Sequence, residues 1–135
     1  MRVFLDANVL FSASYSGSNI ARLIQLLLDK GAAVTSEYAL EEARRNVNLK
    51  RPTWAEDFER LAAQVEVAPS VSFELSVELA EKDVSIMCTA VHAGCETLAT
   101  GDKRHFGHLY GQVVSGVRVV TLFELAQMLT TDQPQ

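Results

Sequence analysis

Short runs of apolar residues alternate along this chain with longer segments in which apolar side chains recur every three or four positions. The short runs predict strands at residues 2–5, 33–35, 65–67, 97–99 and 117–120. The longer segments predict helices at about residues 19–30, 37–51, 53–64, 83–93 and 122–129. Strands that alternate with amphipathic helices are typical of an α/β domain.

Residues that favour helix starts precede several of the amphipathic segments. Ser36 is placed to cap the second helix, because its hydroxyl can accept a hydrogen bond from an amide of the first turn. Thr53 with Glu56, and Thr121 with Glu124, have the spacing of a capping box. These patterns predict where three of the helices begin.

Three features have weaker patterns. Serine and glycine are frequent at residues 12–18, which predicts a loop there. Leu75 and Leu79 favour a helix over residues 73–80. Asp83 stands at the start of an amphipathic segment and is expected to be an N-cap.

Length and composition indicate one globular domain. The 135 residues fit a single domain at 1–130 followed by a frayed tail at 131–135, and 48% of them are hydrophobic. No apolar run is long enough to cross a membrane. Cys88 and Cys95 match neither a redox pair nor a zinc site, so we expect reduced thiols in a cytoplasmic protein.

The net charge of −5 argues against a broadly basic surface that coats nucleic acid. It does not exclude a nuclease, because acids that hold a metal ion contribute to that total. Two basic groups, Arg44-Arg45 and Lys103-Arg104-His105, lie close in sequence to candidate site acids. These groups permit contact with phosphate.

Four acids stand at the edges of predicted elements: Asp6, Glu42, Asp83 and Asp102. Asp6 and Asp102 directly follow short apolar strands, and the carboxyl ends of parallel strands are where α/β folds bind ligands. Carboxylates that converge there would repel one another, by on the order of 4 kcal/mol for a pair ~4 Å apart. A hard divalent cation is the expected reason for such a cluster.

Each acid also has a structural explanation. Asp6 and Asp102 are common turn formers, and Asp83 is a good helix cap. Glu42 has an acidic neighbour, Glu41, so the choice between the two stays open. Glu41 has the spacing for an ion pair with Arg45 four residues later, which leaves Glu42 as the better candidate.

The order of these motifs along the chain resembles the PIN-domain family of metal-dependent ribonucleases, many of which are toxins of toxin–antitoxin pairs. The resemblance rests on residues 4–10 (FLDANVL), on 36–40 followed by Glu42, and on 82–86 (KDVSI). Its strongest part is residues 98–106 (LATGDKRHF). Any one motif is weak, but all four in sequence are fairly specific.

The resemblance implies a three-layer α/β/α sandwich around a parallel sheet of about five strands. It also implies that one or two Mg²⁺ or Mn²⁺ ions are held by the catalytic acids Asp6, Glu42, Asp83 and Asp102. Asn8 and Thr100 match positions that support such a site through hydrogen bonds.

The expected activity is hydrolysis of RNA phosphodiesters by the toxin of a type II toxin–antitoxin system. Phosphate contacts are expected from the basic residues Arg44, Arg45, Lys103, Arg104 and His105. A small antitoxin and a second copy of the chain are the expected protein partners. The helix at residues 54–65 and the loop after Asp6 are candidate partner surfaces.

Two other functions fit parts of the sequence. One is a Mg²⁺-binding receiver-like or phosphohydrolase domain, but the stretch Asp6-Ala7-Asn8 lacks the second aspartate of the usual phosphohydrolase motif. The other is a non-catalytic module that keeps the PIN fold, which the four intact acids disfavour.

Overall fold

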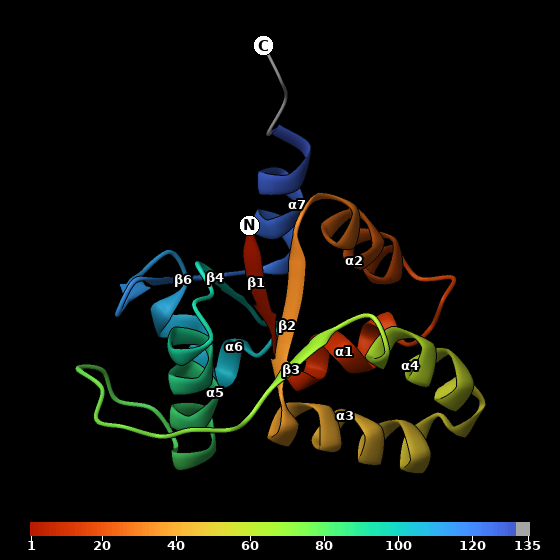
Figure 1. Cartoon of the computed structure of the whole chain (residues 1–135), viewed down its shortest axis with the longest axis horizontal. Coiled ribbons are helices and arrows are strands. Elements are labelled where there is room, and N and C mark those ends of the chain that lie inside the picture. Colours follow the sequence, from red (N-terminus) through yellow and green to blue (C-terminus); the bar gives the residue numbers. More distant parts are fainter. Residues whose placement is uncertain (132–135) are drawn as a thin grey trace.

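The computed structural model describes residues 1–131 (Figure 1). Six strands form its sheet: β1 (Arg2–Leu5), β2 (Ala32–Ser36), β3 (Glu66–Ala68), β4 (Thr97–Ala99), β5 (Val113–Val114) and β6 (Val117–Val120). Seven α-helices accompany them in the described part of the chain: α1 (Ala7–Ala13), α2 (Asn19–Lys30), α3 (Glu37–Lys50), α4 (Ala55–Ala62), α5 (Glu81–His92), α6 (Lys103–Phe106) and α7 (Leu122–Thr131). Two 3₁₀ turns, η1 (Pro52–Trp54) and η2 (Gly107–Leu109), complete the elements described.

The sheet has the strand order β3-β2-β1-β4-β6-β5. All neighbours run parallel except β5, which pairs antiparallel with β6. Figure 1 shows the sheet near its edge, with α5 and α6 on one side and α1, α2 and α4 on the other. The predicted α/β fold with a mostly parallel central sheet is therefore confirmed, and the short β5 is a sixth strand that the sequence pattern did not predict.

The core lies around β1, the middle of the sheet. Val3, Phe4 and Leu5 are fully buried because helices cover both faces of this strand. The parallel registers place Phe4 beside Val34 of β2 and beside Leu98 of β4. The carboxyl ends of β1, β2 and β4 consequently lie along one edge of the sheet.

Each of these three strands passes almost directly into a helix. Asp6 accepts a hydrogen bond from the Ala7 amide at the start of α1, and Ser36 accepts one from Ala39 at the start of α3. Asp102 accepts one from His105 in α6. These caps turn the chain sharply, so polar side chains gather at the strand ends. The predicted cap at Ser36 is confirmed.

The predicted loop is confirmed at residues 14–18, which form neither helix nor strand. Helix α1 before it was not predicted, although its Val9, Leu10 and Ala13 have the three- and four-residue spacing of a buried helix face. The predicted cap at Asp83 is wrong. Helix α5 begins at Glu81 after Ala80, so Asp83 lies inside its first turn and is not the N-cap. The N-cap is the residue directly before a helix, and Ala80 holds that position here because the helix begins at Glu81 and not at Asp83.

Residues 69–80, which we call the strap, form no helix and no strand. Apolar side chains alternate along the strap at every second position, from Val71 to Leu79, and this spacing suits an extended chain. The helix predicted from Leu75 and Leu79 is therefore wrong. The strap is fixed to α5 near its start, where Thr89 accepts a hydrogen bond from the Val71 amide and Cys88 bonds the backbone of Phe73.

The two predicted capping boxes had different outcomes. Thr121 and Glu124 exchange side-chain-to-backbone hydrogen bonds of 2.9 and 3.0 Å, which confirms that box. Thr53 lies inside η1 and α4 begins without a side-chain cap, because Pro52 starts a 3₁₀ turn ahead of the helix.

Of the predicted tail 131–135, Thr131 ends α7 and the rest lies outside the described residues. Within residues 1–131, no helix is both long and apolar enough to span a membrane.

Candidate active site

Asp6 and Asp102 are joined through the side chain of Thr100. Oδ1 of Asp6 accepts from the Ala7 amide at 2.8 Å, and its Oδ2 accepts from the Thr100 hydroxyl at 2.9 Å. The same hydroxyl oxygen accepts from the Asp102 amide at 3.0 Å. Asn8 adds a parallel link, because its Oδ1 accepts from the Gly101 amide at 3.0 Å. The turns after β1 and β4 are thus held together by Asn8 and Thr100.

His105 lies between two of the acids. Its Nδ1 is 3.0 Å from Oδ2 of Asp102 and 3.3 Å from Oδ2 of Asp83. Neither Nδ1 of His105 nor Oδ2 of Asp83 has a partner with hydrogen-bond geometry among the described residues, although both atoms are buried. Asp83 is only 3% exposed. A buried carboxylate oxygen without a hydrogen bond destabilises the folded protein, and a bound cation or a hydrogen-bond donor at this place would remove that destabilisation.

Glu42 is close enough to the other acids to affect them electrostatically, whereas Glu41 is engaged elsewhere. The charge of Glu42 raises the pKa of both Asp6 and Asp83. Glu41 instead forms an ion pair with Arg44, which also binds Glu59 at 2.9 Å. The structure therefore brings Asp6, Glu42, Asp83 and Asp102 into one cluster from four separate segments of the chain.

The pKa values of Asp6 and Asp83 report burial in the first place and repulsion between the acids in the second. The pKa of Asp6 is raised to about 6, mainly by burial and in smaller part by the charges of Asp83 and Glu42, against the hydrogen bonds from Thr100 and Ala7. Burial also raises the pKa of Asp83; Asp102 and Glu42 add to that rise, and His105 and Lys82 oppose it. The cluster holds more negative charge than its neutralising groups balance.

The donor chemistry of the cluster fits a hard cation. Carboxylate oxygens are the ligands that Mg²⁺ and Mn²⁺ prefer, and Oδ2 of Asp83 lacks a hydrogen bond. Among residues 1–131, however, no three His, Cys, Asp or Glu side chains are close enough to hold a metal ion as they stand. This spacing is compatible with Mg²⁺, which keeps several of its waters and is commonly bound by one or two carboxylates.

The basic residues predicted to contact phosphate have different surroundings. Arg44 is held by Glu41 and Glu59 and lies over the ring of Phe58, so its guanidinium is already engaged. Arg45 is exposed on α3. Lys103 and Arg104 are exposed on α6, next to Asp102. The α6 residues are therefore better placed for phosphate than Arg44.

Sequence reasoning missed Tyr110. Its hydroxyl donates to the carbonyl oxygen of Thr100 at 3.0 Å, which fixes the backbone that carries the turn to Asp102. Burial raises the pKa of Tyr110, and the charges of Asp102 and Asp6 raise it further. Tyr110 lies eight positions after Asp102, beyond α6 and η2, and no motif in the sequence links the two.

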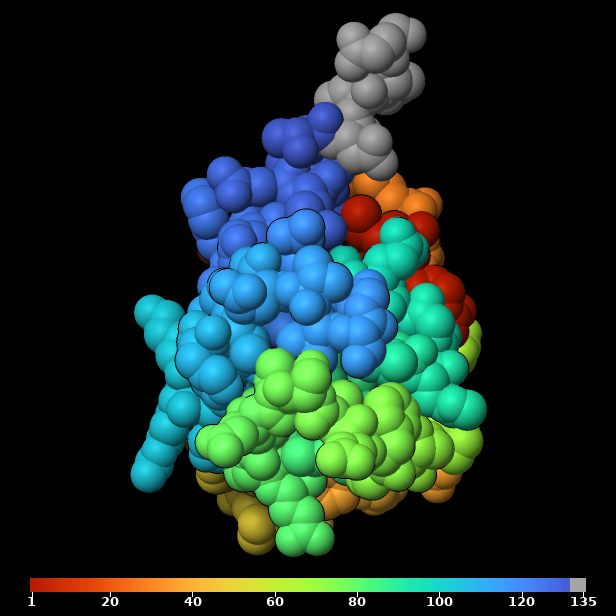
Figure 2. All heavy atoms as spheres, turned by 90° about the vertical axis from the view of Figure 1, so that its left-hand side faces the viewer, coloured from red at the N-terminus to blue at the C-terminus, as the bar shows by residue number. Residues whose placement is uncertain are grey.

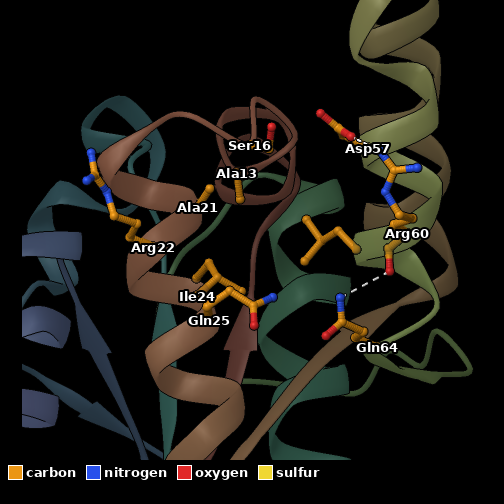
Figure 3. A pocket seen from close by; sticks show the side chains of 10 residues that line it. Ala13, Ser16, Ala21, Arg22, Ile24, Gln25, Asp57, Arg60 and Gln64 are labelled. Atoms are coloured by element: carbon orange, nitrogen blue, oxygen red, sulfur yellow. Dashed lines mark hydrogen bonds and ion pairs between the residues drawn. The ribbon is translucent and has the colours of Figure 1, made fainter.

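A second surface feature lies away from the acids, between α2 and α4. This hollow has a volume of about 220 Å³, and Ala13, Ile24 and Leu61 form its apolar part. Figure 3 shows Arg22 on α2 and Arg60 with Asp57 on α4 at its edges. Its lining includes residues from both regions that the sequence suggested as partner surfaces, the segment after Asp6 and the helix around residues 54–65, and α2 contributes the rest.

Comparisons with solved structures agree with this architecture. A chain of the Rickettsia felis VapBC2 complex, bound to a DNA fragment from its promoter, aligns with a TM-score of 0.66 and 13% identity, over 90% of this chain and 98% of that one. Mycobacterium tuberculosis VapC20, a toxin that cleaves the sarcin–ricin loop, aligns at 0.56 and 13%, over 83% and 98%. A chain of FitAB bound to DNA aligns at 0.57 and 21%, over 90% and 95%.

At this level of identity the alignments establish the fold alone. No curated protein matches the sequence significantly. A profile of the PIN domain family, in contrast, matches residues 3–111, a stretch that contains Asp6, Glu42, Asp83 and Asp102. The family resemblance expected from the sequence is confirmed: this chain belongs to the PIN domain family.

Proposed function

We propose that this chain is a metal-dependent endoribonuclease that acts as the toxin of a type II toxin–antitoxin system. The observation that carries the proposal is the meeting of Asp6, Glu42, Asp83 and Asp102 at one edge of the sheet, where burial first and the neighbouring carboxylates second raise the pKa of Asp6 and Asp83. Such a concentration of carboxylates destabilises the fold unless a cation is bound there. Membership of the PIN domain family favours this function over the receiver-like alternative.

The four acids would hold Mg²⁺ or Mn²⁺. Oδ2 of Asp83 is the first candidate ligand atom, because it is buried and has no hydrogen bond among the described residues. When bound, the ion supplies activation of a water molecule and stabilisation of charge on the phosphate. Thr100 keeps Asp6 and Asp102 in fixed positions relative to each other. Asp83 or Asp102 is placed to orient the attacking water or accept its proton.

The cationic groups of α6 complete the site. Lys103 and Arg104 extend beside Asp102 and can bind the phosphates that flank the reacting one. His105 places Nδ1 within 3.3 Å of Asp83 and 3.0 Å of Asp102, so one imidazole lies between these two carboxylates. Binding of the polyanionic substrate is thereby concentrated next to the acids, even though the chain as a whole is negative.

The partner is proposed to be a small antitoxin, because VapBC2 and FitAB are toxin–antitoxin complexes with this fold. The hollow between α2 and α4 is the docking surface we favour, since Ile24 and Leu61 offer an apolar floor and Arg22 a cation at its edge (Figure 3). We also propose a homodimer, to be checked by light scattering. The free thiols of Cys88 and Cys95 support action in the cytoplasm.

The decisive test uses purified protein, a labelled single-stranded RNA and Mn²⁺, with EDTA as the metal-free control. The wild type should cleave only with metal, and Asp6→Asn or Asp102→Asn should slow cleavage roughly a hundredfold or more. Asp29→Asn is the matched control, because Asp29 is an exposed aspartate on α2 away from the cluster. Undiminished cleavage by both site variants would overturn the assignment.

The same variants test the alternative of a non-catalytic module. Controlled expression of the wild type should arrest bacterial growth, whereas Asp6→Asn should allow it. Arrest by both proteins, with no RNA loss, would indicate a binding module and not a nuclease.

A further inference from the structure

A large hollow adjoins the acid cluster on the side of α5 and α6. Its volume is about 640 Å³, within the range of roughly 300–1,000 Å³ typical of small-molecule sites. One wall is the strap, from Phe73 to Ala80, and the other consists of Val84, Arg104, His105 and His108. Figure 2 looks onto this face of the molecule, with the strap in light green at the front.

His105 connects this hollow to the acids. The side chain lines the hollow, while its Nδ1 lies 3.0 Å from Asp102 and 3.3 Å from Asp83. The hollow and the carboxylates are therefore separated by a single imidazole ring. Arg104, which also lines the hollow, is exposed at the same end.

The strap gives the hollow an apolar wall. Leu75, Val77 and Leu79 are partly buried against the core, and Phe73 remains 43% exposed. The backbone of Phe73 is bonded to Cys88 on α5, which fixes the position of the ring's attachment point. His108 ties the far end of the strap to η2, because its ring nitrogen is 3.2 Å from the carbonyl oxygen of Glu78.

An exposed aromatic ring and a cation, here Phe73 and Arg104 in the lining of one hollow, are the combination by which proteins hold single-stranded nucleic acid. Glu74 and Glu78 also line the hollow, and their negative charges disfavour a second phosphate inside it. A nucleobase carries no charge, and its amino groups can donate to these carboxylates. The electrostatics therefore favour a base inside the hollow and a phosphate at its Arg104 end.

We propose that this hollow binds one base of a single-stranded RNA, adjacent to the phosphodiester at the acid cluster, with the base stacked on Phe73. The proposal rests on the ribonuclease function proposed above and deepens it. It makes the strap a determinant of which RNA sequence is cut, with bases that carry an amino group preferred over uracil.

The test measures binding in EDTA, so that it does not depend on cleavage. Two probes of equal length are compared by fluorescence anisotropy: a single-stranded RNA of random sequence and a ribose-phosphate oligomer without bases. The wild type should bind the RNA roughly tenfold more tightly than the base-free oligomer, and Phe73→Ala should remove most of that preference. Phe73→Trp should restore it.

Phe123→Ala is the matched control, because Phe123 is a 72% exposed phenylalanine on α7 outside the hollow. It should keep the wild-type preference, and circular dichroism should show that every variant is folded. A wild-type preference retained by Phe73→Ala, or an equal loss for both probes, would overturn the proposal. Loss of a co-purified protein partner in Phe73→Ala, with RNA preference unchanged, would also overturn it and assign the hollow to protein.

The outcome is distinguishable from failure of the nuclease assignment. A protein that cleaves RNA with Mn²⁺ and shows no effect of Phe73→Ala keeps its function and loses this subsite. A protein that prefers RNA over the base-free oligomer through Phe73 but never cleaves it keeps the subsite and loses the nuclease assignment.

Discussion

The hydroxyl of Thr100 donates a 2.9 Å hydrogen bond to Oδ2 of Asp6. Both residues are buried, and they lie far apart in the sequence. Thr100→Val keeps the shape of the side chain and removes this donor. It also removes the acceptor for the Asp102 amide. The variant should lose about 1–3 kcal/mol of unfolding free energy, measured by urea denaturation.

Thr100→Ser is the control for that experiment, because it retains the hydroxyl. It should restore both the lost stability and the cleavage activity relative to Thr100→Val. Equal stability of the valine variant and the wild type would mean that this hydrogen bond contributes little.

The raised pKa of Asp6 predicts a pH-dependent effect of Asp6→Asn on stability. A carboxyl whose pKa is higher in the folded than in the unfolded protein destabilises the fold as it ionises. The destabilisation by Asp6 therefore grows as the pH rises from 3.8, the ordinary pKa of the group, to about 6, its pKa in the folded protein. Asp6→Asn should therefore stabilise the metal-free protein near pH 8 by up to about 3 kcal/mol. Below about pH 4 the two proteins should unfold alike.

Thermal melts in EDTA across this pH range check the Asp6 prediction. Asp29→Asn, on exposed α2, should show no such pH dependence. A stabilisation by Asp6→Asn that is the same at every pH would contradict the electrostatic explanation.

The neighbours Glu41 and Glu42 form a natural matched pair. Glu42 acts on the pKa of Asp6 and Asp83, whereas Glu41 pairs with Arg44 at the surface. Glu42→Gln should weaken Mn²⁺ binding by roughly tenfold or more in titration calorimetry. Glu41→Gln should leave metal binding unchanged and cost at most about 1 kcal/mol of stability, as is usual for an exposed ion pair. Weaker metal binding in Glu41→Gln, with unchanged binding in Glu42→Gln, would assign the metal ligand to Glu41.

Metal binding should also stabilise the folded protein. Saturating Mg²⁺ or Mn²⁺ neutralises the cluster and binds only where the four segments are assembled, so it should raise the melting temperature of the wild type. The increase should be lost in Asp83→Asn, because Asp83 carries the buried oxygen without a hydrogen bond. A K⁺ titration at matched ionic strength and the Asp29→Asn protein serve as controls for nonspecific effects.

The cations of α6 should determine the salt dependence of RNA binding. Arg104→Gln should weaken binding to all sequences and reduce the slope of log affinity against log salt by about 0.7, as expected for one lost phosphate contact on a single strand. Arg22→Gln, at an exposed position on α2, should leave the slope unchanged. An unchanged slope for Arg104→Gln would remove this residue from the binding surface.

Local sequence patterns located the acids at strand ends better than those on helices. Asp6 and Asp102 follow buried apolar runs, and a parallel sheet places the ends of such runs side by side. Helical spacing favoured Glu42 for a wrong reason, because Glu41 pairs with Arg44 and not with the predicted Arg45. The position of Arg44 depends on Glu59, which it meets only when α3 packs on α4. Tyr110 reaches Thr100 across a turn for which the sequence carries no motif.

The strap shows a different reason for failure. Its two-residue alternation is a strand pattern, but the described residues contain no strand that pairs with it. Side chains of α5 and the ring of His108 bond its backbone instead. The spacing of apolar residues indicates which side chains are buried, but it does not indicate which groups form hydrogen bonds with the backbone.

The place of β6 in the sheet has a consequence for shortened forms of the chain. The amide of Thr100 bonds the carbonyl oxygen of Val120, and β4 is flanked by β6, so β6 helps to hold the turn that leads to Asp102. A chain cut between residues 103 and 116 keeps all four acids but lacks this strand. Such a fragment should fail to arrange the acids as the intact sheet does, and it should be harmless to the cell that makes it.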